Sequence, residues 1–375
     1  MGKRTNALKS LKITPKEKIF QDIKKSIKER NLSPSRRYSR LIRCLNQKDT
    51  KVVLAFGGGG IRMFAHTAVT RFLEQLKMET CISEIWGVSG GAMIGLAYSM
   101  GITSEQIQQE AMKIASCRQD FKIVPSYFSV AKNLIVETIT QTLFSNNKEN
   151  IKGFHNCQEE LQDFIHKFVK GGKEKYPFYA IAYNLEKNAT DVLTPSSVPE
   201  DVYPNWIYQT DPLDAVIASS SVPILFVPKV IEDRFGRRVY ADGATSEEVP
   251  TVSIYKKWLR DREVGLEHRG RLLVISVNLN PEFSSLGFLE NWLLKKIPAF
   301  QYIQMTIHYA DLMRKAKIEE QKRQLMSDPN VELWDLDFQL RGGGLMNTGL
   351  IPKVITEAER SLPEQLAKIN DSLLV

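Results

Sequence analysis

Cysteine and histidine are scarce in this chain of 375 residues. The four cysteines show no Cys-x-x-Cys spacing and no grouping with the five histidines, which argues against a structural zinc site and a disulfide-rich fold. The Asp-rich loops of a calcium site are also missing. We therefore expect reduced thiols, no metal and no other cofactor. Together with the lack of the apolar region of a secretory signal, this favours a cytoplasmic location.

Long uncharged runs are rare as well. The longest one covers residues 85–104 and contains five glycines and a serine in a glycine-rich setting. This composition favours a buried turn followed by a helix over a membrane span. We expect a soluble protein with at most peripheral membrane contact.

Acidic residues are few at the N-terminus. Residues 1–50 hold fifteen Lys or Arg against four Asp or Glu, whereas the remainder holds 36 basic and 39 acidic residues. Ile19, Ile23 and Ile27 share one face of a helix predicted after Pro15 in this basic arm. Such an arm suits transient contact with an anionic membrane surface, binding to an acidic partner, or simple solvation. It lacks a recognisable RNA or DNA module, so no nucleic-acid partner is expected.

The pattern of the remaining chain predicts an α/β fold. Short apolar runs predict strands at 52–56, 82–88, 178–183, 239–241 and 272–277. A helical pattern follows each of the first two strands. Alternation of strands and helices predicts a three-layer sandwich with a mostly parallel central sheet. We divide the chain into a basic, partly helical arm (1–50), a catalytic domain (51–350) and a C-terminal helical tail (351–375).

A run of four glycines, Gly57 to Gly60, follows the first predicted strand and precedes Ile61 and Arg62. Consecutive glycines let backbone N–H groups converge on an anion, and the next helix adds positive potential. The dinucleotide fingerprint needs a further glycine where Met63 stands, and the phosphate-binding G-K-[ST] sequence is missing. An oxyanion hole and a structural glycine turn both fit what remains.

The second motif is Gly-x-Ser-x-Gly, formed by Gly87, Ser89 and Gly91 between a predicted strand and a predicted helix. Small residues at the two glycine positions permit the sharp turn that exposes a nucleophilic serine. This context favours a nucleophile over a serine buried in a structural turn.

A nucleophilic serine needs a base. Asp242 ends the predicted strand 239–241 and is followed by Gly243, so a carboxylate acting directly on Ser89 is one arrangement. A triad of Ser89 and Asp242 with His268 or His308 is the alternative. His66, on the helix after the glycine run, is expected to be a buried structural histidine.

These motifs, taken in order, resemble those of the patatin-like phospholipases. Gly58-Gly59-Gly60-Ile61-Arg62, Gly87-Val88-Ser89-Gly90-Gly91 and Asp242-Gly243-Ala244 match that family's glycine-rich loop, serine elbow and Asp-Gly motif. Residues 178–193 and 218–223 resemble neighbouring blocks. The resemblance covers 51–255 well and 256–350 loosely, and Met63 departs from it, because many members have glycine there.

The resemblance implies a Ser–Asp dyad that cleaves fatty-acyl esters of glycerophospholipids, a phospholipase A activity. Ser89 would be the nucleophile and Asp242 the general base. The resemblance also implies an oxyanion hole formed by Gly58, Gly59, Gly60 and Arg62, in which Arg62 would hold the loop or contact the lipid phosphate. Gly87 and Gly91 would form the serine elbow, and Gly243 the turn after Asp242. Met63 leaves open a non-catalytic module that binds lipid or protein.

Two further features bear on the cellular setting. The apolar-rich segment 286–300, with two embedded lysines, fits an interfacial anchor or lid and fits a core segment equally well. Residues 357–359 and 373–375 resemble the export signals of bacterial effectors delivered into host cells. A protein or small-molecule activator is open as well.

Overall fold

The computed structural model describes residues 38–116, 158–170, 172–204, 206–223, 226–233, 236–282, 312–313, 315–341 and 348–373. Four sequence-based expectations lie wholly or mostly outside these residues: the helix after Pro15, the segment 286–300, the position of His308 and the C-terminal segment 373–375.

The described helices and strands alternate along much of the chain. In order they are α3 (Ser39–Leu45), β1 (Thr50–Phe56), η1 (Gly60–Ala65), α4 (His66–Gln75), η2 (Glu79–Cys81), β2 (Ile82–Val88), α5 (Gly90–Ser99), α6 (Ser104–Ser116), α8 (Gln158–Val169), β3 (Phe178–Asn184), β4 (Ala189–Thr194), β5 (Ile207–Tyr208), α9 (Pro212–Ser219), β6 (Lys229–Asp233), β7 (Gly236–Asp242), η3 (Gly243–Thr245), α10 (Thr251–Glu263), β8 (Arg271–Glu282), β9 (Val331–Arg341), η4 (Thr348–Leu350) and α13 (Ile351–Ser372). All five predicted strands are present; β2 has the predicted bounds, and the other four are longer than predicted.

The nine described strands form one mixed sheet. Its main path runs β5-β4-β3-β2-β1-β8-β9, and the β6–β7 hairpin joins it through β3. Neighbours are parallel from β3 through β2, β1 and β8 to β9, and also between β4 and β5. The antiparallel pairs are β3–β4, β3–β7 and β6–β7.

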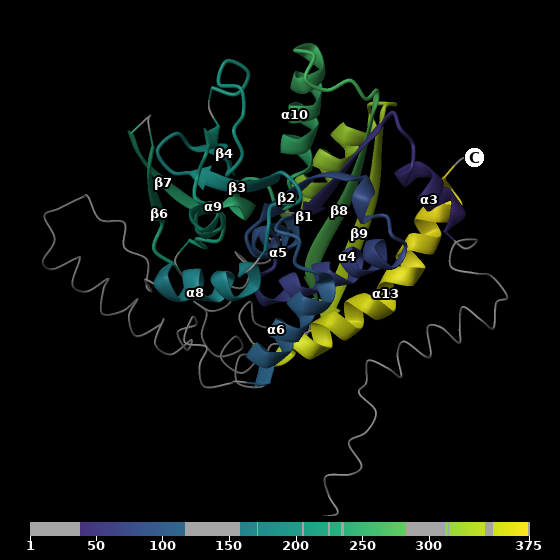
Figure 1. Cartoon of the computed structure of the whole chain (residues 1–375), viewed down its shortest axis with the longest axis horizontal. Coiled ribbons are helices and arrows are strands. Elements are labelled where there is room, and N and C mark those ends of the chain that lie inside the picture. Colours follow the sequence, from purple (N-terminus) through teal and green to yellow (C-terminus); the bar gives the residue numbers. More distant parts are fainter. Residues whose placement is uncertain are drawn as a thin grey trace, which may run out of the picture.

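Helices cover both faces of this sheet (Figure 1). The side chains of β1 alternate between the two faces, as a strand requires. Val52, Leu54 and Phe56 enter the larger core, which includes residues of α4, α5, α6, α9 and α13. Val53 and Ala55 enter a smaller core on the face covered by α10. The predicted α/β fold with a mostly parallel central sheet flanked by helices is therefore confirmed.

The ends of the described chain pack together. Helix α13 contacts α3, α4, α6 and β9 and runs along the outside of that layer (Figure 1). The backbone N–H of Arg40, in α3, donates to Asn370 Oδ1 at 3.2 Å, and its guanidinium donates to the carbonyl of Leu373 at 3.2 Å. The buried side chains Leu41 and Leu45 add α3 to the larger core.

Residues 85–104 contain most of β2, the turn at Ser89 and α5, which agrees with the expected buried turn and helix. Within the described residues, no helix has the length and apolar character needed to cross a membrane.

Candidate active site

Ser89 occupies a sharp turn between β2 and α5. Its backbone has φ of 53° and ψ of −125°, a strained conformation for a non-glycine residue. The flanking glycines are required by close packing. A Cβ on Gly87 would lie 2.5 Å from the Cα of Ala92, and one on Gly91 would lie 2.4 Å from the carbonyl oxygen of Phe56. The turn therefore has the geometry of a nucleophile elbow.

Asp242 lies next to the Ser89 turn, at the end of a strand that runs antiparallel to β3. Val88, the last residue of β2, pairs with Ile181 of β3, and Asp242, the last residue of β7, pairs with Ala182. Because β2 is parallel to β3 and β7 is antiparallel to it, the C-terminal ends of β2 and β7 meet along one edge of β3. Gly243 then allows a tight exit, since a Cβ there would lie 2.1 Å from the Ile181 carbonyl oxygen.

The two side chains are in contact inside the protein. Ser89 is 6% exposed and Asp242 is 3% exposed. Burial raises the pKa of the Asp242 carboxyl to about 7, although hydrogen bonds from the Ser89 side chain and the Ala244 N–H act to lower it; the negative charge of Glu248 raises it further. A carboxyl with a pKa close to neutrality and a serine within hydrogen-bond reach suits general-base chemistry.

The glycine run lies against this pair. A Cβ on Gly58 would be 3.5 Å from the Ser89 Cβ. The N–H of Gly58, however, donates to the carbonyl of Glu248 at 3.0 Å, and so it is already used. The N–H groups of Gly59, Gly60 and Gly90 have no acceptor within the described part of the chain. These three N–H groups are therefore free to donate to an oxyanion, whereas that of Gly58 is not; the oxyanion role of the glycine run stays a prediction.

Arg62 is buried and forms hydrogen bonds to the glycine run. It is 6% exposed, and both its backbone N–H (3.1 Å) and its Nε (3.4 Å) donate to the carbonyl of Gly59. These contacts agree with a loop-holding role and leave the Arg62 side chain little access to a lipid phosphate. Met63 is buried in the larger core, with its Cβ close to Gly90. A Cβ on Gly90 would lie 2.9 Å from it, so glycine at 90 accommodates the departure from the family pattern.

His66 has the structural role expected for it. It is fully buried and its Nε2 lies 2.9 Å from the carbonyl oxygen of Gly57, a geometry in which Nε2–H donates and the ring is neutral. Burial lowers the His66 pKa to about 3, against the opposing effect of that hydrogen bond. His66 thus holds the start of the glycine run.

No described histidine contacts the Ser89–Asp242 pair. His268 is exposed in the connection that precedes β8. Because β8, β1 and β2 are parallel, His268 lies at the N-terminal end of these strands. Ser89 follows the other end of β2. The triad with His268 is therefore wrong, because His268 and Ser89 lie at opposite ends of the parallel strands. His308 lies outside the described residues, so the triad with His308 stays a prediction.

The sequence reading did not include Glu248 or the N–H of Gly90 in the site. The position of Gly90, directly after the nucleophile, is a signal that was available. For Glu248 there was no local signal, since its contact with Gly58 joins residues 190 positions apart.

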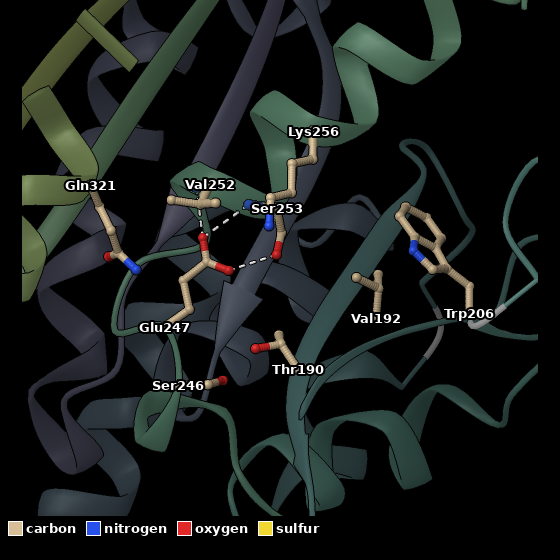
Figure 2. Close-up of a pocket in the computed structure, with 9 residues that line it drawn as sticks. All are labelled: Thr190, Val192, Trp206, Ser246, Glu247, Val252, Ser253, Lys256 and Gln321. Atoms are coloured by element: carbon tan, nitrogen blue, oxygen red, sulfur yellow. Dashed lines mark hydrogen bonds between the residues drawn. The ribbon is translucent and has the colours of Figure 1, made fainter. Parts of the chain in front are cut away.

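The turn that follows Asp242 borders a cavity of about 310 Å³ (Figure 2). Glu247 lines it, and its carboxylate accepts hydrogen bonds from the backbone N–H groups of Val252 (2.6 Å) and Ser253 (3.0 Å) at the start of α10. The Ser253 hydroxyl donates to the other carboxylate oxygen at 2.6 Å. Glu247 thereby attaches the Asp242 turn to α10. Ser89, Asp242 and the glycine run are not among the lining residues, so the cavity does not include the Ser89–Asp242 pair.

No group of His, Cys, Asp and Glu side chains within the described residues is arranged to hold a metal ion.

A family model described as patatin-like phospholipase matches residues 54–254, more than half of the chain. No curated protein matches the sequence. The matched range contains the four-glycine run, the serine elbow and the Asp-Gly motif.

Among solved structures, VipD from Legionella pneumophila is similar with 13% identity and a TM-score of 0.39, covering 86% of this chain and 67% of its own. The type III effector protein ExoU is similar with 10% identity and a TM-score of 0.34, covering 86% and 53%. Human GIVD cytosolic phospholipase A2 has 12% identity and a TM-score of 0.24, covering 49% and 26%. This chain thus spans about half of ExoU and about a quarter of the human enzyme.

Proposed function

The chain belongs to the patatin-like phospholipase family, and on this basis we propose that it is a phospholipase A-type lipid acyl hydrolase that uses a Ser89–Asp242 dyad. The observation that carries the proposal is the hydrogen bond between the Ser89 side chain and a buried carboxyl whose pKa is raised to about 7, by burial above all. No described histidine competes with Asp242 for the role of base.

In the acylation step, Ser89 Oγ attacks the carbonyl carbon of a fatty-acyl ester while Asp242 takes the hydroxyl proton. The carbonyl oxygen becomes an oxyanion, which the N–H groups of Gly59, Gly60 and Gly90 stabilise. Loss of one such donor costs about 3 kcal/mol of transition-state stabilisation in comparable hydrolases. Collapse of the intermediate breaks the ester bond, and the departing lysophospholipid oxygen takes the proton from Asp242.

Deacylation repeats these steps with water. Asp242, again ionised, takes a proton from a water molecule that attacks the acyl-enzyme carbonyl. The second intermediate collapses with departure of Ser89 Oγ, which recovers the proton from Asp242, and a fatty acid is released.

A membrane surface is the setting in which such an enzyme would meet its substrate. Residues 1–50 hold fifteen basic and four acidic residues, and this positive charge supports contact with anionic phospholipids. We therefore also propose that the chain acts on phospholipid at a membrane surface, with residues 1–50 as the contacting arm, 51–350 as the catalytic domain and 351–375 as a helical tail.

The test is release of free fatty acid from vesicles of mixed anionic and zwitterionic phospholipids, with a metal chelator present. Wild type should release fatty acid, whereas Ser89→Ala and Asp242→Asn should not. Equal release by all three proteins would overturn the dyad. His308→Ala separates the dyad from the remaining triad, because the dyad predicts that this variant keeps most activity and the triad predicts that it loses it.

A non-catalytic lipid-binding module is the alternative of another class. A fluorophosphonate, which forms a covalent bond with an activated serine, distinguishes it. Covalent labelling of wild type but not of Ser89→Ala supports the hydrolase, and vesicle binding without labelling would support the binding module.

A further inference from the structure

A serine outside the two motif turns contacts the backbone of the nucleophile. The hydroxyl oxygen of Ser219, the last residue of α9, accepts a hydrogen bond from the Ser89 N–H at 2.9 Å. Ser219 is fully buried. The contact joins residues 130 positions apart in the sequence and connects α9 to the strained turn between β2 and α5.

The same short segment also holds the second half of the dyad. The carbonyl of Ser221 accepts a hydrogen bond from the Asp242 N–H at 2.8 Å. Residues 219–221 therefore connect the backbones of Ser89 and Asp242 through two hydrogen bonds, one made by a side chain and one by the main chain. A segment that is bound to both residues fixes the spacing between them.

The elbow needs such a partner. Ser89 adopts φ of 53°, a conformation that persists only when its surroundings determine it. Its N–H points into the protein, where a donor without an acceptor is costly. The neighbouring turns do not provide that acceptor, and the Ser219 hydroxyl does.

We propose that Ser219 is a positioning residue, whose hydroxyl oxygen orients the backbone of Ser89 so that the nucleophilic Oγ faces Asp242. It makes no contact with substrate and acts only through Ser89. The inference deepens the proposed function and rests on it, since orientation of Ser89 matters only when Ser89 reacts.

The three adjacent serines differ in a way that makes the inference testable. The Ser220 hydroxyl is buried and has no hydrogen-bond partner among the described residues, and the Ser221 hydroxyl donates to the carbonyl of Ile217 in α9 at 2.8 Å. Of these three hydroxyls, that of Ser219 is the one that contacts the elbow. Ser99, at the far end of α5, offers a matched control: it is 1% exposed and its hydroxyl donates to the Leu96 carbonyl at 2.8 Å.

The experiment measures the kinetics with which a long-chain alkyl fluorophosphonate inactivates the full-length protein. The rate constant of the covalent step and the affinity of the reversible step are determined separately for wild type, Ser219→Ala, Ser220→Ala and Ser99→Ala. Ser219→Ala should lower the covalent rate constant roughly tenfold to a hundredfold, the effect of one lost positioning contact, with the reversible affinity unchanged. Ser220→Ala and Ser99→Ala should react at the wild-type rate.

Ser219→Cys provides a second variant of nearly the same size, in which sulfur replaces oxygen as a weaker acceptor. It should also react more slowly, and it decides the matter if Ser219→Ala does not fold. Wild-type rates in the folded Ser219 variants, or an equal loss in Ser99→Ala, would overturn the positioning role. Failure of the proposed function gives a different result, because wild type itself would then not be labelled.

Discussion

Val88 and Asp242 pair with consecutive residues of β3, Ile181 and Ala182, so that β2 and β7 end against each other along one strand edge. Ser89 follows the first of these ends, and Asp242 is the second. The sheet itself thus brings the candidate nucleophile and base together. Buried together, they form a carboxyl–hydroxyl pair in which burial, above all, keeps the acid form of Asp242 stable up to about neutral pH.

The first prediction concerns the pH dependence of hydrolysis. Only ionised Asp242 can accept the Ser89 proton, and burial raises its pKa to about 7. We expect kcat/KM for a soluble acyl ester to fall as pH decreases, with a midpoint near 7, as measured in a series of buffers of equal ionic strength.

Glu248 allows a check on that assignment. After burial, which is the largest influence on the Asp242 pKa, the negative charge of Glu248 acts in the same direction. Glu248→Gln should therefore move the midpoint to lower pH. A midpoint that stays in place in this variant would assign the titration to another group.

The second prediction concerns stability. The pKa of Asp242 is about 7 in the folded protein and 3.8 in its unperturbed state, so the folded state binds the proton more tightly. Its contribution to stability is complete below about pH 4 and is lost as pH rises through 7. At one pKa unit per 1.36 kcal/mol, the ionised carboxylate costs up to about 4 kcal/mol at pH 8. Asp242→Asn should thus raise Tm at pH 8, and the difference should shrink towards pH 5.

Glu263→Gln is the control for this measurement, since Glu263 is exposed on α10 and its removal should change Tm little at either pH. A lower Tm for Asp242→Asn at pH 8 would contradict the conclusion that the ionised Asp242 carboxylate destabilises the folded protein. The expected pattern, loss of activity with gain of stability, is one that active sites commonly show.

The third prediction separates two glycines. An added Cβ at Gly58 meets Ser89 and Ala244 only at ordinary contact distance, 3.5 Å in each case. Gly58→Ala should fold with nearly unchanged Tm, yet its methyl group occupies the space beside the nucleophile, and we expect at least a tenfold loss of ester hydrolysis from steric obstruction. Gly91→Ala should instead be strongly destabilised, because its Cβ would lie 2.4 Å from a backbone carbonyl oxygen.

Thermal unfolding and ester hydrolysis of both variants provide the comparison. Equal destabilisation by the two substitutions would show that the glycine run is structural throughout. Full activity in folded Gly58→Ala would place the substrate carbonyl elsewhere.

The local parts of this site were predictable from the sequence. The strand 82–88 and the turn at Ser89 follow from an apolar run and two glycines a few residues apart, and the structure has β2 at the predicted bounds. Strand β9 also had a readable signal that was not used. Its alternating residues Trp334, Leu336, Phe338 and Leu340 are all buried in the larger core, the period expected of a strand.

The contacts that assemble the site were not predictable. The pairing of β7 with β3, the bond from Gly58 to Glu248 and the bond from Ser89 to Ser219 join segments that are distant in the sequence. Local pattern carries no information on which strand ends meet. For the same reason the triad with His268 was a wrong prediction. The strand register shows that His268 lies at the N-terminal end of the parallel strands, whereas Ser89 lies at their C-terminal end.

The last prediction concerns a buried charge cluster at the start of β2, away from the dyad. Glu84 Oε1 lies 2.6 Å from Lys51 Nζ and 2.8 Å from Lys257 Nζ, and its other oxygen accepts a hydrogen bond from the Trp86 indole at 3.0 Å. All three charged residues are at most 7% exposed. Desolvation opposes the charged form of Glu84, yet the two ammonium groups hold its pKa below the usual value.

Glu84→Gln keeps the shape but removes the negative charge between two buried ammonium groups. Leaving a buried charge without a partner costs about 3–5 kcal/mol. Glu84→Gln should cost less than that, because Lys257 Nζ keeps Asp261 at 2.6 Å and Lys51 Nζ keeps Glu267 at 3.3 Å. It should still cost more than Glu364→Gln, which breaks an exposed pair with Lys368 on α13 and should cost less than about 1 kcal/mol. Urea unfolding measures both. Because Glu84 and Ser89 lie near opposite ends of β2, the fluorophosphonate labelling rate per folded molecule should be unchanged in Glu84→Gln; a reduced rate would show that the cluster acts on the elbow through the strand.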